Sequence, residues 1–134
     1  MASPLDAFLP AVQTWFGETF GPPTPPQAEG WPAIQRGEHT LILAPTGSGK
    51  TLAAFLWGID RIYRELLEQA AGTSEKSDDA SGVRLLYISP LKALNNDIYR
   101  NLRVPLAGIR RAALAAADAY PPIKVSVRMT NGRC

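Results

Sequence analysis

The 134-residue chain has the length of a single domain with its own hydrophobic core. Hydrophobic residues make up 46% and charged residues 19%, which argues against wholesale disorder. The longest uninterrupted apolar runs are six residues, whereas a helix that crosses a bilayer needs about 20, so we expect no membrane segment. The one cysteine, Cys134, and the absence of a secretory signal pattern predict a reducing, cytoplasmic location.

The net charge of +2 conceals a division along the chain. Residues 1–82 hold five basic and ten acidic side chains, a net charge of −5, and residues 83–134 hold nine basic and two acidic side chains, a net charge of +7. A polyanion such as DNA or RNA would be attracted to the second part. The alternative is a solvated helix face whose acidic partners lie in the first part. Charge alone leaves both interpretations open.

The first half of the chain predicts two short helices, a strand and a long helix. Pro10 opens a helix with apolar residues on one face, which Gly17 weakens. After a proline-rich connector, Thr24 can cap a second helix that starts at Pro25 and ends near Gly37. Residues 40–43 predict a buried strand, and apolar residues at helical spacing predict a long amphipathic helix from Lys50 to near Gly72.

The second half repeats the strand and helix pattern. Residues 72–82 predict a surface loop, 83–88 a second buried strand, and 124–128 a third. A helix is expected to start at Ser89 and Pro90, to break or restart at Pro105, and to continue as an alanine-rich helix over 107–117. The alternation predicts an α/β fold, with a parallel sheet flanked by helices.

The strand-to-helix junction at 41–57, LILAPTGSGKTLAAFLW, predicts a phosphate-binding loop. Unpaired N–H groups at a helix start bind anionic oxygens, and Gly47 and Gly49 let the backbone curl around them. Lys50 supplies a positive charge and Thr51 a hydroxyl for a magnesium ion. The pattern G-x-x-x-x-G-K-[ST] is met except at its first residue, which is Ala44. A glycine-rich turn with an incidental lysine is the alternative, and the strand and helix on either side favour nucleotide binding.

Three segments together resemble a known family. APTGSGKT, at 44–51, resembles motif I of superfamily-two helicases, PTPPQAEGWPAI resembles their adenine-recognising Q motif, and YISPLKALNND resembles their motif Ia. The chain looks most like the large helicase-related family of DEAD/DEAH-box ATP-dependent helicases, over residues 8 to about 128. The resemblance implies that residues 1–134 are the amino-terminal part of a RecA-like P-loop ATP-binding domain.

The resemblance also implies site residues and cofactors. ATP and Mg²⁺ are the expected cofactors, and Gln27 would pair with the adenine edge. Lys50 and Thr51 would be the catalytic residues, with Thr51 also ligating magnesium. The phosphates would be cradled by Thr46, Gly47, Ser48, Gly49, Lys50 and Thr51. The sugar-phosphate backbone of DNA or RNA, single-stranded or duplex, would meet Pro90, Leu91 and Lys92.

Some parts of such a helicase are missing from this sequence. No Asp-Glu-x-His segment follows an apolar strand, because Asp78 and Asp79 precede the second strand, and no second RecA-like lobe is present. We therefore expect a truncated or frame-changed helicase segment that binds ATP without hydrolysing it or unwinding nucleic acid alone. The rest of the helicase is its expected partner. The incomplete sheet is also expected to leave edges that favour association.

Other functions remain open from the residues alone. The chain could be a non-catalytic module that binds a nucleotide or nucleic acid, or a nonfunctional gene fragment. Another P-loop ATPase or a kinase is disfavoured by Gln27 and by residues 87–97. Trp31 and Trp57 are expected in the core rather than as base-stacking platforms, and His39 at the surface.

Overall fold

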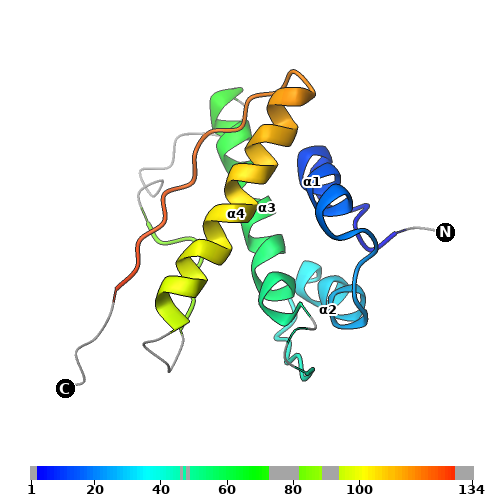
Figure 1. The fold of residues 1–134 in the computed structure, drawn as a ribbon. Coiled ribbons are helices and arrows are strands. Elements are labelled where there is room, and N and C mark those ends of the chain that lie inside the picture. Colours follow the sequence, from blue (N-terminus) through cyan, green and yellow to red (C-terminus); the bar gives the residue numbers. More distant parts are fainter. Residues whose placement is uncertain (1–2, 46, 48, 73–81, 89–93, 129–134) are drawn as a thin grey trace.

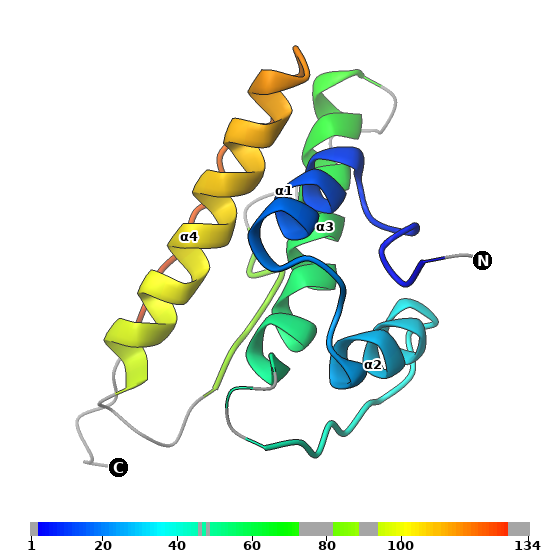
Figure 2. The same ribbon diagram turned by 45° about the vertical axis from the view of Figure 1, so that its right-hand side comes forward.

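The computed structural model describes residues 3–45, 47, 49–72, 82–88 and 94–128. In this part of the chain the helices are α1 (Pro10–Phe20), α2 (Pro25–Gln35), α3 (Lys50–Ala70) and α4 (Leu94–Ala115). α1 packs against α4 and α2 against α3, while α3 and α4 run in the same direction (Figure 1). Turned by 45°, the molecule shows α2 crossing near the start of α3 (Figure 2). Among the described residues, no helix has both the length and the hydropathy to span a bilayer.

Local capping signals set most helix ends, as predicted. α2 begins at Pro25 with Thr24 as its N-cap, and Gly37 follows its end with φ +77°. α3 begins at Lys50, and Gly72 beyond its end has φ +70°. Positive φ is accessible to glycine at little cost, which explains why these helices stop there. α1 begins at Pro10 as predicted, but it continues through Gly17 to Phe20.

The prediction that Pro105 breaks a helix is wrong. α4 runs without interruption from Leu94 to Ala115 with Pro105 inside it. Proline has no N–H, so the carbonyl of Asn101 loses its helical hydrogen bond. Pro105 itself is buried, and the next turns are anchored by the fully buried Ile109 and Ala113. Packing of this apolar face outweighs the local preference of proline.

The three predicted strands are extended but unpaired within the described residues, so the parallel sheet is not confirmed. Residues 40–43, 83–88 and 124–128 carry no strand ladder. Residues 40–45 pass beneath the start of α3, whereas 119–128 run back beside α4 (Figure 1, Figure 2). A ladder needs a neighbouring backbone at about 4.8 Å, which these segments do not provide for one another.

Two of these extended segments, 40–43 and 83–88, nevertheless pack side chains against a helix. Ile42 lies against Gly30 of α2, and Leu85 lies against Gly58 of α3. Tyr87 also contacts α3, with 4.8 Å between its ring centroid and that of Phe55. The alternation of side chains is that of strands with one covered face.

The core lies where α1 meets the other three helices. Its fully buried side chains include Val12, Phe16, Trp31, Leu56, Tyr63 and Ile109. Trp31 is a core residue as predicted, whereas Trp57 is only partly buried at the core edge. His39 is exposed, as expected.

Candidate nucleotide site

The predicted phosphate loop leads directly into the longest amphipathic helix of the first half. Gly47 and Gly49 have φ of +83° and +80°, and α3 begins at the next residue, Lys50. Thr51 is exposed and Lys50 is partly buried. Thr46 and Ser48 lie outside the described residues. The extended segment, the two left-handed glycines and the helix start thus occur in the order that phosphate binding requires.

The start of α3 fits an anionic ligand. Gly49 is its N-cap and has no side chain, and no cap hydrogen bond from a side chain is present at this end. The first turn contains no acidic residue. A 21-residue helix concentrates partial positive charge on its first N–H groups, and here no carboxylate of the first turn neutralises it. With the Lys50 ammonium and the Thr51 hydroxyl in that turn, the donors suit a polyphosphate carrying a magnesium ion.

Gln27 is joined to this loop by its side chain. It is 4% exposed, on the first turn of α2. Its Oε1 accepts a hydrogen bond from the Thr24 N–H at 3.0 Å, and its Nε2 donates to the Gly49 carbonyl at 3.3 Å. A carboxamide has two donor and two acceptor positions. These two bonds leave the second amide hydrogen and the second lone pair of Oε1 for another partner.

Gly49 is required by two independent constraints. Its φ of +80° disfavours any residue with a Cβ. A Cβ at this position would also overlap the Gln27 Nε2 atom. The loop and α2 therefore approach each other so closely that only glycine fits.

Trp31 fastens α2 to α3 one turn farther along. Its indole Nε1 donates to the Ala53 carbonyl at 3.1 Å, and the side chain is fully buried. A buried indole N–H needs such an acceptor, because an unpaired one would cost about 1–3 kcal/mol. The bond sets the separation of the helices that carry Gln27 and Lys50.

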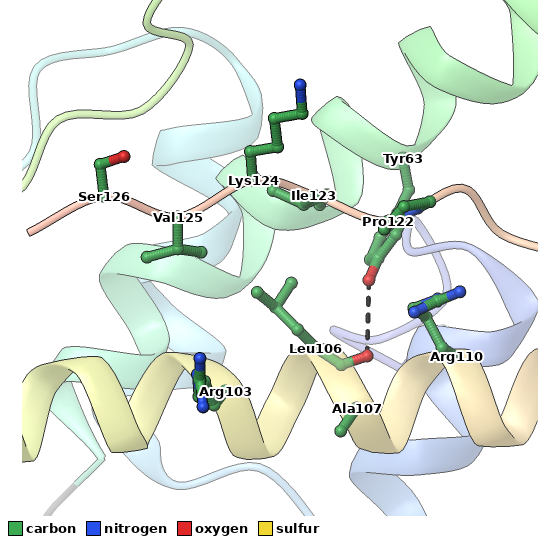
Figure 3. A pocket seen from close by; sticks show the side chains of 10 residues that line it. All are labelled: Tyr63, Arg103, Leu106, Ala107, Arg110, Pro122, Ile123, Lys124, Val125 and Ser126. Carbon is green, nitrogen blue, oxygen red and sulfur yellow. Dashed lines mark hydrogen bonds between the residues drawn. The ribbon is translucent and has the colours of Figure 1, made fainter.

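Several basic side chains among the described residues of the second half lie on α4 and on the segment that follows it. A cavity of about 540 Å³ lies between them, rimmed by Arg103, Arg110 and Lys124 (Figure 3). Val125 points toward α4 in this view and Lys124 points away from it. The Arg110 Nε donates to the Tyr120 carbonyl at 3.2 Å. These exposed cations favour an anionic partner.

Other charges in this part of the chain support the alternative of internal pairing. Arg84 lies 3.6 Å from Glu65 of α3, an acidic partner in the first half.

At the wall of the cavity, the Tyr63 hydroxyl donates to the Leu106 carbonyl at 3.5 Å. Burial raises the pKa of Tyr63 to about 12.

The predicted nucleic-acid contacts cannot be placed beside the loop. Pro90, Leu91 and Lys92 lie outside the described residues, as do Asp78 and Asp79. Description resumes at Leu94, where α4 starts. The contacts at 90–92 therefore stay predictions.

Sequence reasoning missed one buried charge, Asp60 of α3, which is fully inaccessible. Its carboxylate accepts hydrogen bonds from the Leu9 N–H and from Arg64 Nε, both at 2.6 Å. Burial has the largest effect and raises the pKa of Asp60 above its ordinary value, although the two hydrogen-bond donors act in the opposite direction. A signal was available, because Asp60 lies at helical spacing from the apolar residues Leu56 and Tyr63, and Arg64 follows it by four residues.

Comparisons with known proteins agree on one family. The DEAD/DEAH box helicase family matches residues 24–125. A Mycolicibacterium smegmatis protein described as Lhr helicase and probable uracil glycosylase is 49% identical over 127 residues, 95% of this chain and 8% of that protein. The Escherichia coli Lhr helicase/uracil glycosylase is 42% identical over 123 residues, 92% of this chain and 8% of its own length.

A solved structure is also similar. The Mycobacterium smegmatis helicase Lhr bound to ssDNA and AMP-PNP is 46% identical in sequence and superimposes with a TM-score of 0.81. The match covers 98% of this chain and 15% of that one. The described chain therefore has the fold of the corresponding helicase region.

Proposed function

Because this chain belongs to the DEAD/DEAH box helicase family, we propose that it is the ATP-binding and nucleic-acid-binding segment of an Lhr-type ATP-dependent helicase. The observation that carries the proposal is the uncapped start of α3 behind Gly47 and Gly49, with Gln27 hydrogen-bonded to the same loop. The chain spans 8% of the two bacterial relatives, so the activity of the whole helicase is part of the proposal.

In this proposal the loop binds the triphosphate and α2 recognises the base. Residues 46–51 surround the phosphates, with the Lys50 ammonium on the outer ones. Thr51 would hold Mg²⁺, which when bound neutralises phosphate charge. Gln27 presents its remaining donor and acceptor to the adenine edge, a pairing that guanine does not match. Support comes from the AMP-PNP bound to the similar Lhr structure.

Nucleic acid is proposed to bind on the basic second part. Pro90, Leu91 and Lys92 would contact the sugar-phosphate backbone of a DNA or RNA strand, which positions the strand without selecting a sequence. Support comes from the ssDNA bound to the similar Lhr structure and from the net charge of +7 over residues 83–134.

We further propose that the 134 residues bind ATP without turning it over. Hydrolysis needs a metal-binding acidic pair and an arginine from an opposing lobe, and the arginine alone is worth about 10³–10⁵ in rate. Residues 40–43, 83–88 and 124–128 would form the RecA-like parallel sheet once further strands pair with them. A second RecA-like lobe is the expected partner, and a cytoplasmic location stays a prediction.

Calorimetric titration with AMP-PNP and Mg²⁺ tests the nucleotide site. Lys50→Ala should weaken binding by at least about tenfold, because it removes a charge-assisted contact to phosphate. Arg61→Ala, which removes an exposed cation from the same helix, should bind as the wild-type chain does. Unchanged binding in Lys50→Ala would refute the site.

Filter binding of labelled single-stranded DNA tests the proposed binding of nucleic acid. We expect retention that weakens steeply as salt concentration rises, since phosphate contacts release counterions.

ATP hydrolysis by the 134 residues, measured as phosphate release, should stay at the background of Lys50→Ala. Turnover above that background would show that hydrolysis needs no further lobe.

A further inference from the structure

The segment before α1, residues 3–9, precedes the span that matches the helicase family and packs where α2 meets α3. Phe8 in this segment is 2% exposed. Its ring lies edge-on to Trp31 of α2, with 5.0 Å between centroids, and edge-on to Trp57 of α3, with 5.4 Å. The interplanar angles are 72° and 86°, as favourable edge-to-face pairs require. Phe8 therefore bridges the two helices.

Two charged side chains of α3 hold the backbone on either side of Phe8. Asp60 accepts the hydrogen bond from the Leu9 N–H at 2.6 Å, and Arg64 Nη2 donates to the Ala7 carbonyl at 2.7 Å. Arg64 Nε also donates to Asp60 at 2.6 Å, which joins the two side chains. Both neighbours of Phe8 are thus tied to one helix. We call Phe8, Asp60 and Arg64 the Phe8 clasp.

The buried carboxylate indicates that the clasp fixes a geometry. Asp60 is fully inaccessible, and removing a carboxylate from water costs several kcal/mol. Buried ion pairs seldom add net stability over apolar residues of the same volume, and their best-attested role is to specify one arrangement. Here the arrangement is the position of the Phe8 ring between two indoles.

That position bears on the nucleotide site through Trp31. Trp31 follows Gln27 by four residues on α2, and Ala53 follows Gly49 by four residues on α3, so each lies about one helical turn away. The bond between Trp31 and the Ala53 carbonyl and the bond between Gln27 and the Gly49 carbonyl are therefore consecutive links between the same two helices. A shift of Trp31 would move Gln27 relative to the phosphate loop.

We propose that the Phe8 clasp is a positioning element for adenine recognition, which holds Gln27 in register with the phosphate loop. This inference rests on the proposed function, because it assumes that Gln27 contacts the base. In this proposal the clasp acts on the base site through its contact with Trp31. Loosening it should therefore weaken binding of ATP and spare binding of the phosphates alone.

Calorimetric titration of the chain with ATP and with inorganic tripolyphosphate, both with Mg²⁺, separates these effects. Phe8→Ala should weaken ATP binding by about three- to tenfold, the value of one hydrogen bond, and change tripolyphosphate binding by less than about twofold. Arg64→Gln, at a half-exposed side chain, should show the same selective loss if Phe8→Ala does not fold. Leu5→Ala, a truncation in the same segment, should leave both affinities unchanged.

The outcomes are distinguishable. A selective loss of ATP binding in Phe8→Ala or Arg64→Gln supports the clasp. Equal loss of both ligands, or no loss in a folded variant, overturns it while the nucleotide site stands. If the wild-type chain binds neither ligand, the proposed function fails and the clasp role fails with it.

Discussion

At Gly49 a left-handed backbone and a neighbouring side-chain amide both disfavour a residue with a Cβ. The φ of +80° and the overlap that a Cβ would make with Gln27 Nε2 act together. We expect Gly49→Ala to abolish AMP-PNP binding in calorimetry, because the loop must either change its backbone or expel Gln27. Binding at wild-type affinity would show that the loop tolerates both changes.

Gly17 provides the matched control for that substitution. It lies inside α1 and is exposed, and a Cβ there would meet no atom within 4 Å. Gly17→Ala should raise the free energy of unfolding by roughly 0.5–1 kcal/mol, because alanine loses less backbone entropy in a helix. Urea denaturation checks the sign, and nucleotide affinity should not change.

Tyr63 gives a prediction about pH. Its fully buried hydroxyl has a pKa of about 12, raised from 10.0, so the folded state resists ionisation that the unfolded chain permits. The stability from this group is complete below pH 10 and is lost as pH rises toward 12. Wild-type stability relative to Tyr63→Phe should fall by about 2–3 kcal/mol over that range. If urea denaturation showed the same pH dependence for the wild-type chain and for Tyr63→Phe, the raised pKa of Tyr63 would be contradicted.

At the scale of elements, α1 meets α4 through a glycine. Gly108 is buried, and a Cβ there would overlap the indole of Trp15, which is only 6% exposed. We expect Gly108→Ala to lower the free energy of unfolding by about 1–3 kcal/mol, because a rigid indole cannot move aside in a packed core. Gly17→Ala is again the control, since the same change there should stabilise. A stabilised Gly108→Ala would mean that α1 is held elsewhere.

Helix ends lie where capping residues and left-handed glycines predict them, unless tertiary packing opposes these local signals. Thr24 with Pro25 began α2, and the left-handed Gly37 followed its end, as the sequence predicted. Pro105 did not end α4, because its cost is opposed by buried neighbours such as Ile109 that only the fold supplies. A local signal predicts an element when no larger packing term opposes it.

On the scale of the whole molecule, the extended segments leave apolar side chains in water. Leu41, Leu43, Val83 and Ile88 are 80–84% exposed. Unpaired extended backbone with exposed apolar residues is a template for association. Sedimentation velocity should show concentration-dependent association at micromolar concentrations. The double variant Leu43→Lys and Ile88→Lys should reduce it, and a wild-type chain that stays monomeric would contradict this view.

The sequence by itself determined the starts of α1, α2 and α3, the left-handed glycines Gly47 and Gly49 and the candidate phosphate residues, whereas the helix expected from Ser89 and Pro90 is described only from Leu94. Those features depend on φ, capping and charge within a few residues of the chain. The tertiary structure alone decided that Gln27 reaches the Gly49 carbonyl, 22 residues away, and that the Leu9 N–H reaches Asp60, 51 residues away. Such contacts depend on how helices pack, because their partners are brought together only when the core forms.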